Sequence, residues 1–99
     1  MQFDFSAHDS TVAMTGDFTF TDHPAFLQLM KRLLGSPGAP MIIDLSQLTF
    51  IDSAGLGMLL IARDEAGKAK RSLSLRRPRG QIQRMFSVSK FSTLFTIET

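Results

Sequence analysis

Apolar and polar residues alternate near the start of the chain, and a period of two is typical of β-strands. Phe3 and Phe5 carry this alternation, and a second alternating stretch runs from Val12 to Phe20. Residues 8–10, His-Asp-Ser, have the composition of a turn between the two stretches. Gly16 interrupts the second stretch and is predicted to mark a bulge. Strands this close in sequence are expected to pair as an antiparallel hairpin.

The pattern then changes to a helical period. Thr21 or Asp22 can cap the free amides of a helix start, and Pro24 suits its first turn. Apolar residues follow at i, i+3, i+4, i+7 and i+8, which places them on one helical face. These residues are Phe26, Leu29, Met30, Leu33 and Leu34. Gly35 and Pro37 are expected to end this helix.

Strand and helix patterns alternate through the rest of the chain. A continuous apolar run at residues 41–45 predicts a central strand covered on both faces, and it continues to Ile51. The elements expected after it are a helix opened by residues 52–55, with an inner face of Leu56, Leu59, Leu60 and the Arg63 stem and an end at Gly67, a strand at residues 73–75, a helix at residues 82–89 and a strand at residues 94–97. The order ββαβαβαβ predicts an α/β fold with right-handed crossovers. We expect a mixed sheet of four to five strands, with three to four helices packed mainly on one face.

Composition limits the class of protein. The chain has 99 residues, of which 43% are apolar and 20% charged, so a single globular domain spanning residues 1–99 is expected. The absence of cysteine excludes disulfides and thiolate metal sites, and His8 and His23 lack neighbours at ligand spacing. No apolar run reaches the roughly 18–20 residues of a membrane span, and no signal peptide is recognisable. A cytoplasmic protein without a membrane partner or a metal is expected.

The net charge of +2 hides an uneven distribution. Residues 1–52 hold six acids and two bases, net −4, whereas residues 53–99 hold nine bases and three acids, net +6. The basic stretch from Lys68 to Arg79 fits a solvated surface, a docking face for an acidic protein partner, or a nucleic-acid contact. Direct nucleic-acid binding is disfavoured because no stacking aromatic residue is interleaved and no reading helix is evident.

The helix start at Asp52 and Ser53 is the segment that carries chemistry. A serine at a helix N-terminus is exposed beside free amides and the positive end of the helix dipole. Gly55 and Gly57 follow in the first turn, where each costs about 0.8–1.0 kcal/mol relative to alanine. This cost suggests that a loop, a strand or an external partner comes close to the backbone. A tightly packed, capped helix is the alternative. A hydrolase is disfavoured because G-x-S-x-G and a His–acid pair are missing.

The string DLSQLTFIDSAGLGMLL, residues 44–60, resembles the signature of the STAS domain of bacterial anti-sigma-factor antagonists. The element order fits that family over nearly the whole chain. The resemblance implies a regulatory binding protein rather than an enzyme, with no catalytic residue and no cofactor. In phosphorylatable members, the serine after the motif aspartate is the target of a partner serine kinase, which is itself the anti-sigma factor, and Ser53 holds that position. The unphosphorylated antagonist binds this kinase and frees the sigma factor, the phosphorylated form is released, and a metal-dependent serine phosphatase resets it.

The resemblance also implies a partner-binding surface. Its residues are Asp52, Ser53, Ala54, Gly55, Leu56 and Gly57 of the motif, with Thr19 and Thr21 after the second strand. Two residues depart from the family pattern. Ala54 stands where a second serine is common, which leaves Ser53 as the acceptor, and Thr19 stands where many relatives have an acid. The alternative function is a STAS module that is never phosphorylated and that binds a protein or senses a small ligand to regulate a non-sigma output.

Overall fold

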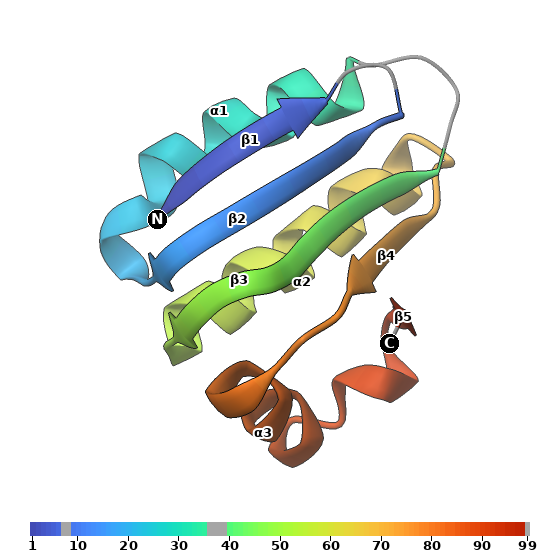
Figure 1. Ribbon diagram of the computed structural model, residues 1–99. Coiled ribbons are helices and arrows are strands. Elements are labelled where there is room, and N and C mark those ends of the chain that lie inside the picture. Colours follow the sequence, from blue (N-terminus) through green and yellow to red (C-terminus); the bar gives the residue numbers. More distant parts are fainter. Residues whose placement is uncertain (7–8, 36–39, 99) are drawn as a thin grey trace.

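The computed structural model describes residues 1–6, 9–35 and 40–98, which form a five-stranded sheet with helices beside it (Figure 1). The strands lie in the order β1-β2-β3-β4-β5, and β1 is antiparallel to β2 whereas the remaining neighbours are parallel. The elements are β1 (Gln2–Ser6), β2 (Thr11–Phe18), the 3₁₀ helix η1 (Phe20–Asp22), α1 (His23–Leu34), β3 (Met41–Ile51), α2 (Ser53–Lys68), β4 (Leu73–Arg76), α3 (Gly80–Val88), the 3₁₀ helix η2 (Phe91–Thr93) and β5 (Thr96–Glu98). The mixed α/β sheet and the order ββαβαβαβ are therefore confirmed.

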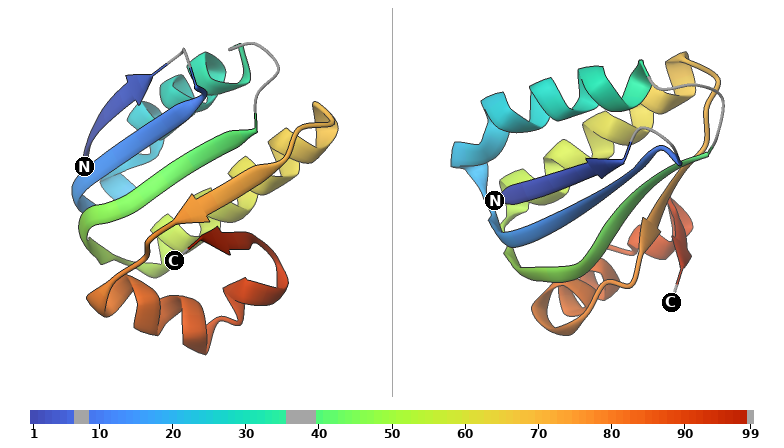
Figure 2. Two further views of the ribbon diagram at one scale, coloured as in Figure 1. Left: turned by 45° about the vertical axis from the view of Figure 1, so that its right-hand side comes forward. Right: turned by 45° about the horizontal axis from the view of Figure 1, so that its top comes forward.

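Helices α1 and α2 cover one face of the sheet, and α3 packs beside the last part of β3, past the end of β4 (Figure 2). The core between sheet and helices follows from the two periodicities in the sequence. The prediction that β3 is covered on both faces is wrong, because buried and half-buried residues alternate from Met41 to Leu45 and only one face is covered by α1 and α2 (Figure 2). The apolar positions of α1 predicted from helical spacing are buried, apart from the half-buried Leu34. The side chains with no measurable exposure include Val12, Met14, Phe18, Leu29, Leu33, Met41, Ile43, Leu45, Ile51, Leu59 and Leu75.

Gly16 marks an irregularity in β2, as expected. The pairing with β3 shifts register between Gly16 and Asp17, and Gly16 has a φ of +82°, which favours glycine. The prediction that β2 continues to Phe20 is wrong, because the strand ends at Phe18. The Asp22 carboxylate accepts a hydrogen bond from the Thr19 amide (2.8 Å) and turns the chain into η1. The turn predicted at residues 8–10 falls partly outside the described residues.

Two boundaries in the second half also differ from expectation. Helix α2 runs past Gly67 to Lys68, because Ala66 still packs in the core, and it ends with Lys70 in the left-handed conformation (φ 57°). The Arg71 amide donates to the Ala66 carbonyl (2.9 Å), which satisfies the last turn. Leu94 and Phe95 precede β5 rather than forming it, since the Phe95 amide bonds back to the Phe91 carbonyl (2.9 Å) after η2.

The Arg63 stem does not line the inner face of α2. Its side chain is exposed, and its Nε donates to the Leu94 carbonyl (2.7 Å). Ala62, one residue earlier, is fully buried in its place. The inner face of α2 therefore combines the small residues Ala62 and Ala66 with the larger Leu56 and Leu59.

Gln81 of α3 fixes the end of β3. Its side-chain amide accepts a hydrogen bond from the Ile51 amide (3.0 Å) and donates one to the Ile51 carbonyl (2.9 Å). Strand β4 pairs with β3 only over Met41 to Asp44, so the last part of β3 extends beyond its neighbour. The Gln81 side chain thus provides, at Ile51, the acceptor and the donor that the backbone of a neighbouring strand provides elsewhere along β3.

Arg71 ties three segments together and is expected to be important for stability. Its guanidinium donates to the carbonyls of Leu33 (3.1 Å) and Leu34 (3.2 Å) at the end of α1, and to the Ser10 hydroxyl (3.4 Å). Arg71→Met should lower the free energy of unfolding by about 1.5–3 kcal/mol, the usual contribution of hydrogen bonds to a charged group. Urea denaturation measures this loss.

Lys68→Met is the matched control for Arg71→Met, because the Lys68 side chain is 74% exposed and contacts only Glu65 (3.4 Å) among the described ion pairs. Its effect should stay within about 0.5 kcal/mol. Equal unfolding free energies for the two variants would contradict the structural role of Arg71.

Candidate functional site

The predicted serine lies at the first position of α2, and its neighbour caps the helix. Asp52 has an extended backbone, and its Oδ1 accepts a hydrogen bond from the Gly55 amide (2.8 Å). Of the two possible caps, the structure therefore selects Asp52. Ser53 is exposed, and no hydrogen bond of its hydroxyl is found within the described residues. The Ser53 hydroxyl is thus displayed to solvent at the positive end of a 16-residue helix.

The two glycines of the first turn have different environments. A Cβ added at Gly55 would lie 2.6 Å from the Phe18 carbonyl oxygen and 2.6 Å from Cγ1 of Ile51. Gly55 is therefore needed for the close packing of α2 on the ends of β2 and β3. A Cβ added at Gly57 would meet no described atom within 4 Å. The close approach expected from the sequence is intramolecular at Gly55, and nothing within the described residues requires glycine at position 57.

The Asp52 carboxylate also holds the loop that follows β2. Its Oδ2 accepts a hydrogen bond from the Phe20 amide (3.3 Å), while the Asp52 amide donates to the Phe18 carbonyl (3.3 Å). Thr19 and Thr21 belong to the same loop, and their hydroxyls are 3.1 Å apart. One residue thus joins the start of α2 to η1, which brings the Thr19 and Thr21 loop beside the motif as the resemblance implied.

Asp22 fixes the other side of this loop. Burial raises the pKa of its carboxyl, but hydrogen bonds from the Met1 amino group (2.7 Å) and the Thr19 amide outweigh burial and leave the pKa below its usual value. Asp22 is therefore held in the ionised form that accepts both bonds. The loop is anchored at both ends by carboxylates, from Asp22 and from Asp52.

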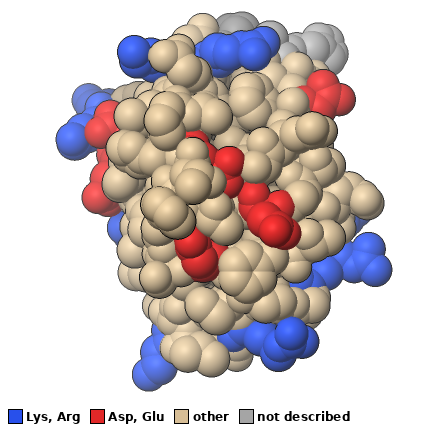
Figure 3. All heavy atoms as spheres, turned by 90° about the vertical axis from the view of Figure 1, so that its left-hand side faces the viewer, with Lys and Arg blue, Asp and Glu red and all other residues tan. Residues whose placement is uncertain are grey.

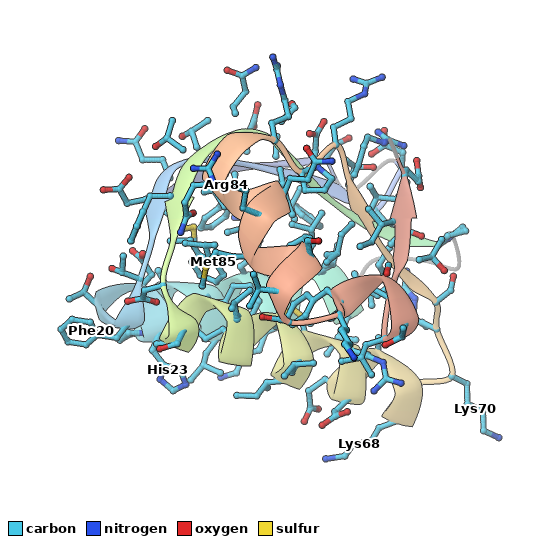
Figure 4. The ribbon with its side chains drawn as sticks, turned by 90° about the horizontal axis from the view of Figure 1, so that it is seen from below. Phe20, His23, Lys68, Lys70, Arg84 and Met85 are labelled. Atoms are coloured by element: carbon cyan, nitrogen blue, oxygen red, sulfur yellow. The ribbon has the colours of Figure 1, made fainter. Side chains whose placement is uncertain are left out.

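An apolar hollow of about 280 Å³ lies between η1, α1 and α2. Its lining residues are Phe20, His23, Ala54, Gly57, Met58 and Ile61, which we call the Phe20 hollow. The Phe20 side chain is 70% exposed and that of Ile61 is 44% exposed. Figure 4 shows Phe20 and His23 side by side at the beginning of α2, with Phe20 extending away from the ribbon. An exposed phenylalanine on an anchored loop is typical of a protein-binding surface.

Sequence reasoning missed Phe20, His23, Met58 and Ile61 as parts of this surface. A signal exists on α2, because Ala54, Met58 and Ile61 recur at i, i+4 and i+7, and this apolar stripe runs from the buried Met58 at the border of the core to the exposed Ile61. In contrast, Gly55 and Leu56 are buried. Asp52, Ser53, Ala54 and Gly57 are therefore the motif residues that lie within reach of a partner.

Acidic side chains surround this end of the molecule. Figure 3 looks onto the end where β2 and β3 finish and α1 and α2 begin, and Asp and Glu gather near its middle while Lys and Arg lie at its margins. Asp17, Asp22 and Asp52 belong to the elements at this end. Much of the negative charge of the first half of the chain is therefore concentrated around the motif.

The basic stretch from Lys68 to Arg79 does not form one patch. Lys68 and Lys70 extend outward at the far end of α2 from Phe20 (Figure 4), whereas Arg71 caps α1. Arg76 forms an ion pair with Glu98 (3.2 Å). The residues of this stretch therefore have different environments. The prediction that the stretch is a solvated surface is wrong for Arg71, which bonds to the end of α1.

The comparisons with known proteins agree with this architecture. The family model described as "Mlab, STAS domain" matches residues 1–96. The chain belongs to the STAS-domain family. A STAS-domain-containing protein of Pseudomonas aeruginosa (strain UCBPP-PA14) is 33% identical over 87 residues, which cover 88% of this chain and 85% of that protein.

Solved structures of anti-sigma factor antagonists share the fold of this STAS domain. One from Mycobacterium paratuberculosis superposes with a TM-score of 0.83 at 20% identity, covering 98% of this chain and 84% of that one. SpoIIAA in its unphosphorylated form gives a TM-score of 0.71 at 18% identity, covering 99% and 86%. The resemblance inferred from residues 44–60 is therefore confirmed at the level of family and fold.

Within the described residues, no group of three or more His, Asp and Glu side chains is placed to hold a metal ion. His23 lines the Phe20 hollow, and His8 lies outside the described residues. In the part of the chain that the structure describes, no helix has both the length and the apolar character needed to cross a membrane.

Proposed function

We propose that this STAS domain is a cytoplasmic anti-sigma-factor antagonist whose binding is switched at Ser53. In the unmodified form it binds a serine-kinase anti-sigma factor, phosphorylation of Ser53 releases it, and a metal-dependent serine phosphatase restores it. The domain itself is a binding protein and not an enzyme. The observation that carries the proposal is that Asp52 supplies the helix cap while the exposed Ser53 hydroxyl is left available.

The expected effect of phosphorylation on the fold is small. A phosphate adds about −1.5 to −2 charges, and the helix dipole favours it by about 0.3–1 kcal/mol at an exposed site. The neighbouring Asp52 carboxylate opposes it by a comparable amount. Because Asp52 and not Ser53 caps the helix, modification removes no capping hydrogen bond. The two small electrostatic effects nearly cancel.

The expected effect on a complex is large. A partner that covers α2 would bury the doubly charged phosphate, and an unpaired buried charge costs several kcal/mol. Phosphorylation thus blocks an interface and leaves the domain folded.

Phosphorylation by the cognate serine kinase tests the proposal. The purified protein is incubated with that kinase and ATP, and its intact mass is measured. The expected result is a gain of one phosphate, which is absent from Ser53→Ala. No gain in mass would contradict the switch and favour the STAS module that is never phosphorylated, and a gain that persists in Ser53→Ala would place the acceptor elsewhere.

Phe20 is expected to be an anchor of the complex. Phe20→Ala should weaken kinase binding by about 2 kcal/mol, or about thirtyfold, because exposed aromatic residues at the centre of an interface carry much of its affinity. Isothermal titration calorimetry with the kinase measures the change. Val88→Ala is the control, because Val88 is 81% exposed but lies on α3. Equal affinities for the two variants would remove Phe20 from the interface.

A further inference from the structure

A second hollow, of about 680 Å³, lies on the other side of α3 from the Gln81 contact and is separate from the Phe20 hollow. Its walls come from α3, from the linker between β4 and α3, and from η2 and β5. We call it the α3 groove. Its volume lies within the range of about 300–1,000 Å³ that is usual for small-molecule sites.

The floor of the α3 groove is apolar and firmly supported. Pro78 is buried, Phe86 is 4% exposed and Ile97 is half-buried. The Phe86 ring stacks on Phe91 (centroids 4.9 Å apart), and Phe91 stacks in turn on Phe95 (5.1 Å). A stacked aromatic support of this kind holds the floor in one shape, which favours an occupant with an apolar body.

One end of the groove is strongly cationic. Arg77 and Arg79 both line it, both are exposed, and neither has an ion pair within the described residues. The nearby Glu98 carboxylate is engaged by Arg76 (3.2 Å), and the Arg77 amide donates to the Glu98 carbonyl (2.6 Å). The local acid is therefore paired with a different arginine.

The start of α3 adds to this positive field. Arg79 is the N-cap of the helix, and it provides no side-chain acceptor for the first amides. The first turn contains no acidic residue. Two arginines and a helix start without an acidic residue therefore border the same cavity, and Ser87 and Ser92 also line it.

We propose that the α3 groove binds a small organic anion with an apolar body. The carboxylate or phosphate ester of this ligand pairs with the guanidiniums of Arg77 and Arg79, whose planar donor groups suit bidentate contact with either anion. The apolar body lies over Pro78, Phe86 and Ile97. This site is independent of the Ser53 switch and would give the domain a small-molecule input.

Nuclear magnetic resonance titration of the isotope-labelled chain tests the proposal. The probes are decanoate, an alkyl carboxylate, and para-nitrophenyl phosphate, an aromatic phosphate ester. Decanol, phenol and inorganic phosphate are the controls that lack either the anion or the apolar body. The expected result is saturable shifts of α3, η2 and β5 amides with at least one probe, and weaker or no shifts with the three controls. The responding probe distinguishes an alkyl carboxylate from an aromatic phosphate source.

Two variants and a matched control identify the anion-binding end. Arg77→Gln and Arg79→Gln should each weaken binding about tenfold. Arg84→Gln should leave it unchanged, because Arg84 is on the same helix but does not line the groove (Figure 4). The amide spectra of the variants report whether each remains folded.

Three results would overturn the proposal. The first is the absence of saturable shifts with both organic anions. The second is binding of inorganic phosphate or the neutral alcohols as tight as that of the probes, which would indicate an adventitious ion or a nonspecific apolar contact only. The third is shifts confined to the Phe20 hollow. Each of these outcomes leaves the phosphorylation of Ser53 untouched, so the two proposals fail separately.

Discussion

Gly55→Ala is expected to destabilise the protein by about 1–3 kcal/mol, the usual cost of forcing an extra methyl group into a packed site. The new Cβ would lie 2.6 Å from the Phe18 carbonyl oxygen, and this backbone atom at the end of β2 cannot move aside at low cost because it accepts a hydrogen bond from the Asp52 amide. The clash can be relieved only if the start of α2, which carries Ser53 and the Asp52 cap, moves away from the sheet. Urea denaturation followed by circular dichroism measures the change.

Gly57→Ala is the matched control for Gly55→Ala. It places the same methyl group two residues further along the same helix, where no described atom outside the local helix backbone lies within 4 Å. Here only helix propensity acts, and the variant should be more stable by up to about 0.8–1.0 kcal/mol. A Gly55→Ala variant as stable as wild type would show that α2 does not pack on β2 and β3 as closely as described. A destabilised Gly57→Ala would mean that Gly57 has a contact within the chain.

The same pair of variants separates stability from binding. Since nothing in the described structure requires glycine at position 57, a Gly57→Ala variant that is stable but binds the kinase poorly would assign this glycine to the partner surface. Gly55→Ala is expected to lose both stability and binding, because it displaces the start of α2, which carries Ser53.

Ser53→Asp is expected to abolish most of the affinity for the partner kinase while leaving the domain folded. A carboxylate at the exposed start of α2 is compatible with the helix dipole, but burial of that charge under a partner without a counter-ion costs several kcal/mol. A loss of about 4 kcal/mol corresponds to nearly a thousandfold in the dissociation constant. Calorimetric titration with the kinase measures this loss, and thermal unfolding confirms that the variant is folded.

Ser53→Ala and Ser53→Asn are the controls for charge. Alanine should retain binding, since the Ser53 hydroxyl makes no hydrogen bond within the described residues. Asparagine has nearly the size of aspartate without its charge, so it separates electrostatic exclusion from a steric clash. If Ser53→Asp binds the kinase as tightly as wild type, the interface is not blocked by charge at this position. If Ser53→Asn binds the kinase as weakly as Ser53→Asp, the loss of affinity is steric and not electrostatic.

Much of the fold could be predicted from the sequence because periodicity is a local property. The apolar face of α1 follows from residue spacing alone, and the irregularity at Gly16 in β2 can be recognised from the residues around it. The one-sided burial of β3 could not be predicted from spacing, because its apolar run at residues 41–45 does not alternate. The boundary at Phe20 could not be predicted in this way. It depends on the Asp52 carboxylate, which lies 32 positions away and accepts a hydrogen bond from the Phe20 amide.

The candidate site was predictable in its centre but not in its extent. Ser53 and Asp52 could be recognised from the motif, yet the sequence treats Gly55 and Gly57 alike. Only the position of the Phe18 carbonyl relative to α2 distinguishes them. Gly67 illustrates the reverse case, in which a helix-ending residue type stands inside a helix because Ala66 still has core to cover and Lys70 adopts the left-handed conformation.

The contact between Gln81 and Ile51 has a consequence for solubility. Where a strand outlasts its neighbour, its unpaired amide and carbonyl groups form an open edge to which a strand from another molecule can add, and such edges promote aggregation. A glutamine amide carries the same donor and acceptor as a peptide group, so at Ile51 it occupies the position that an intruding strand would take. Helix α3 therefore closes the exposed end of β3 against extension of the sheet, immediately beside the proposed partner surface.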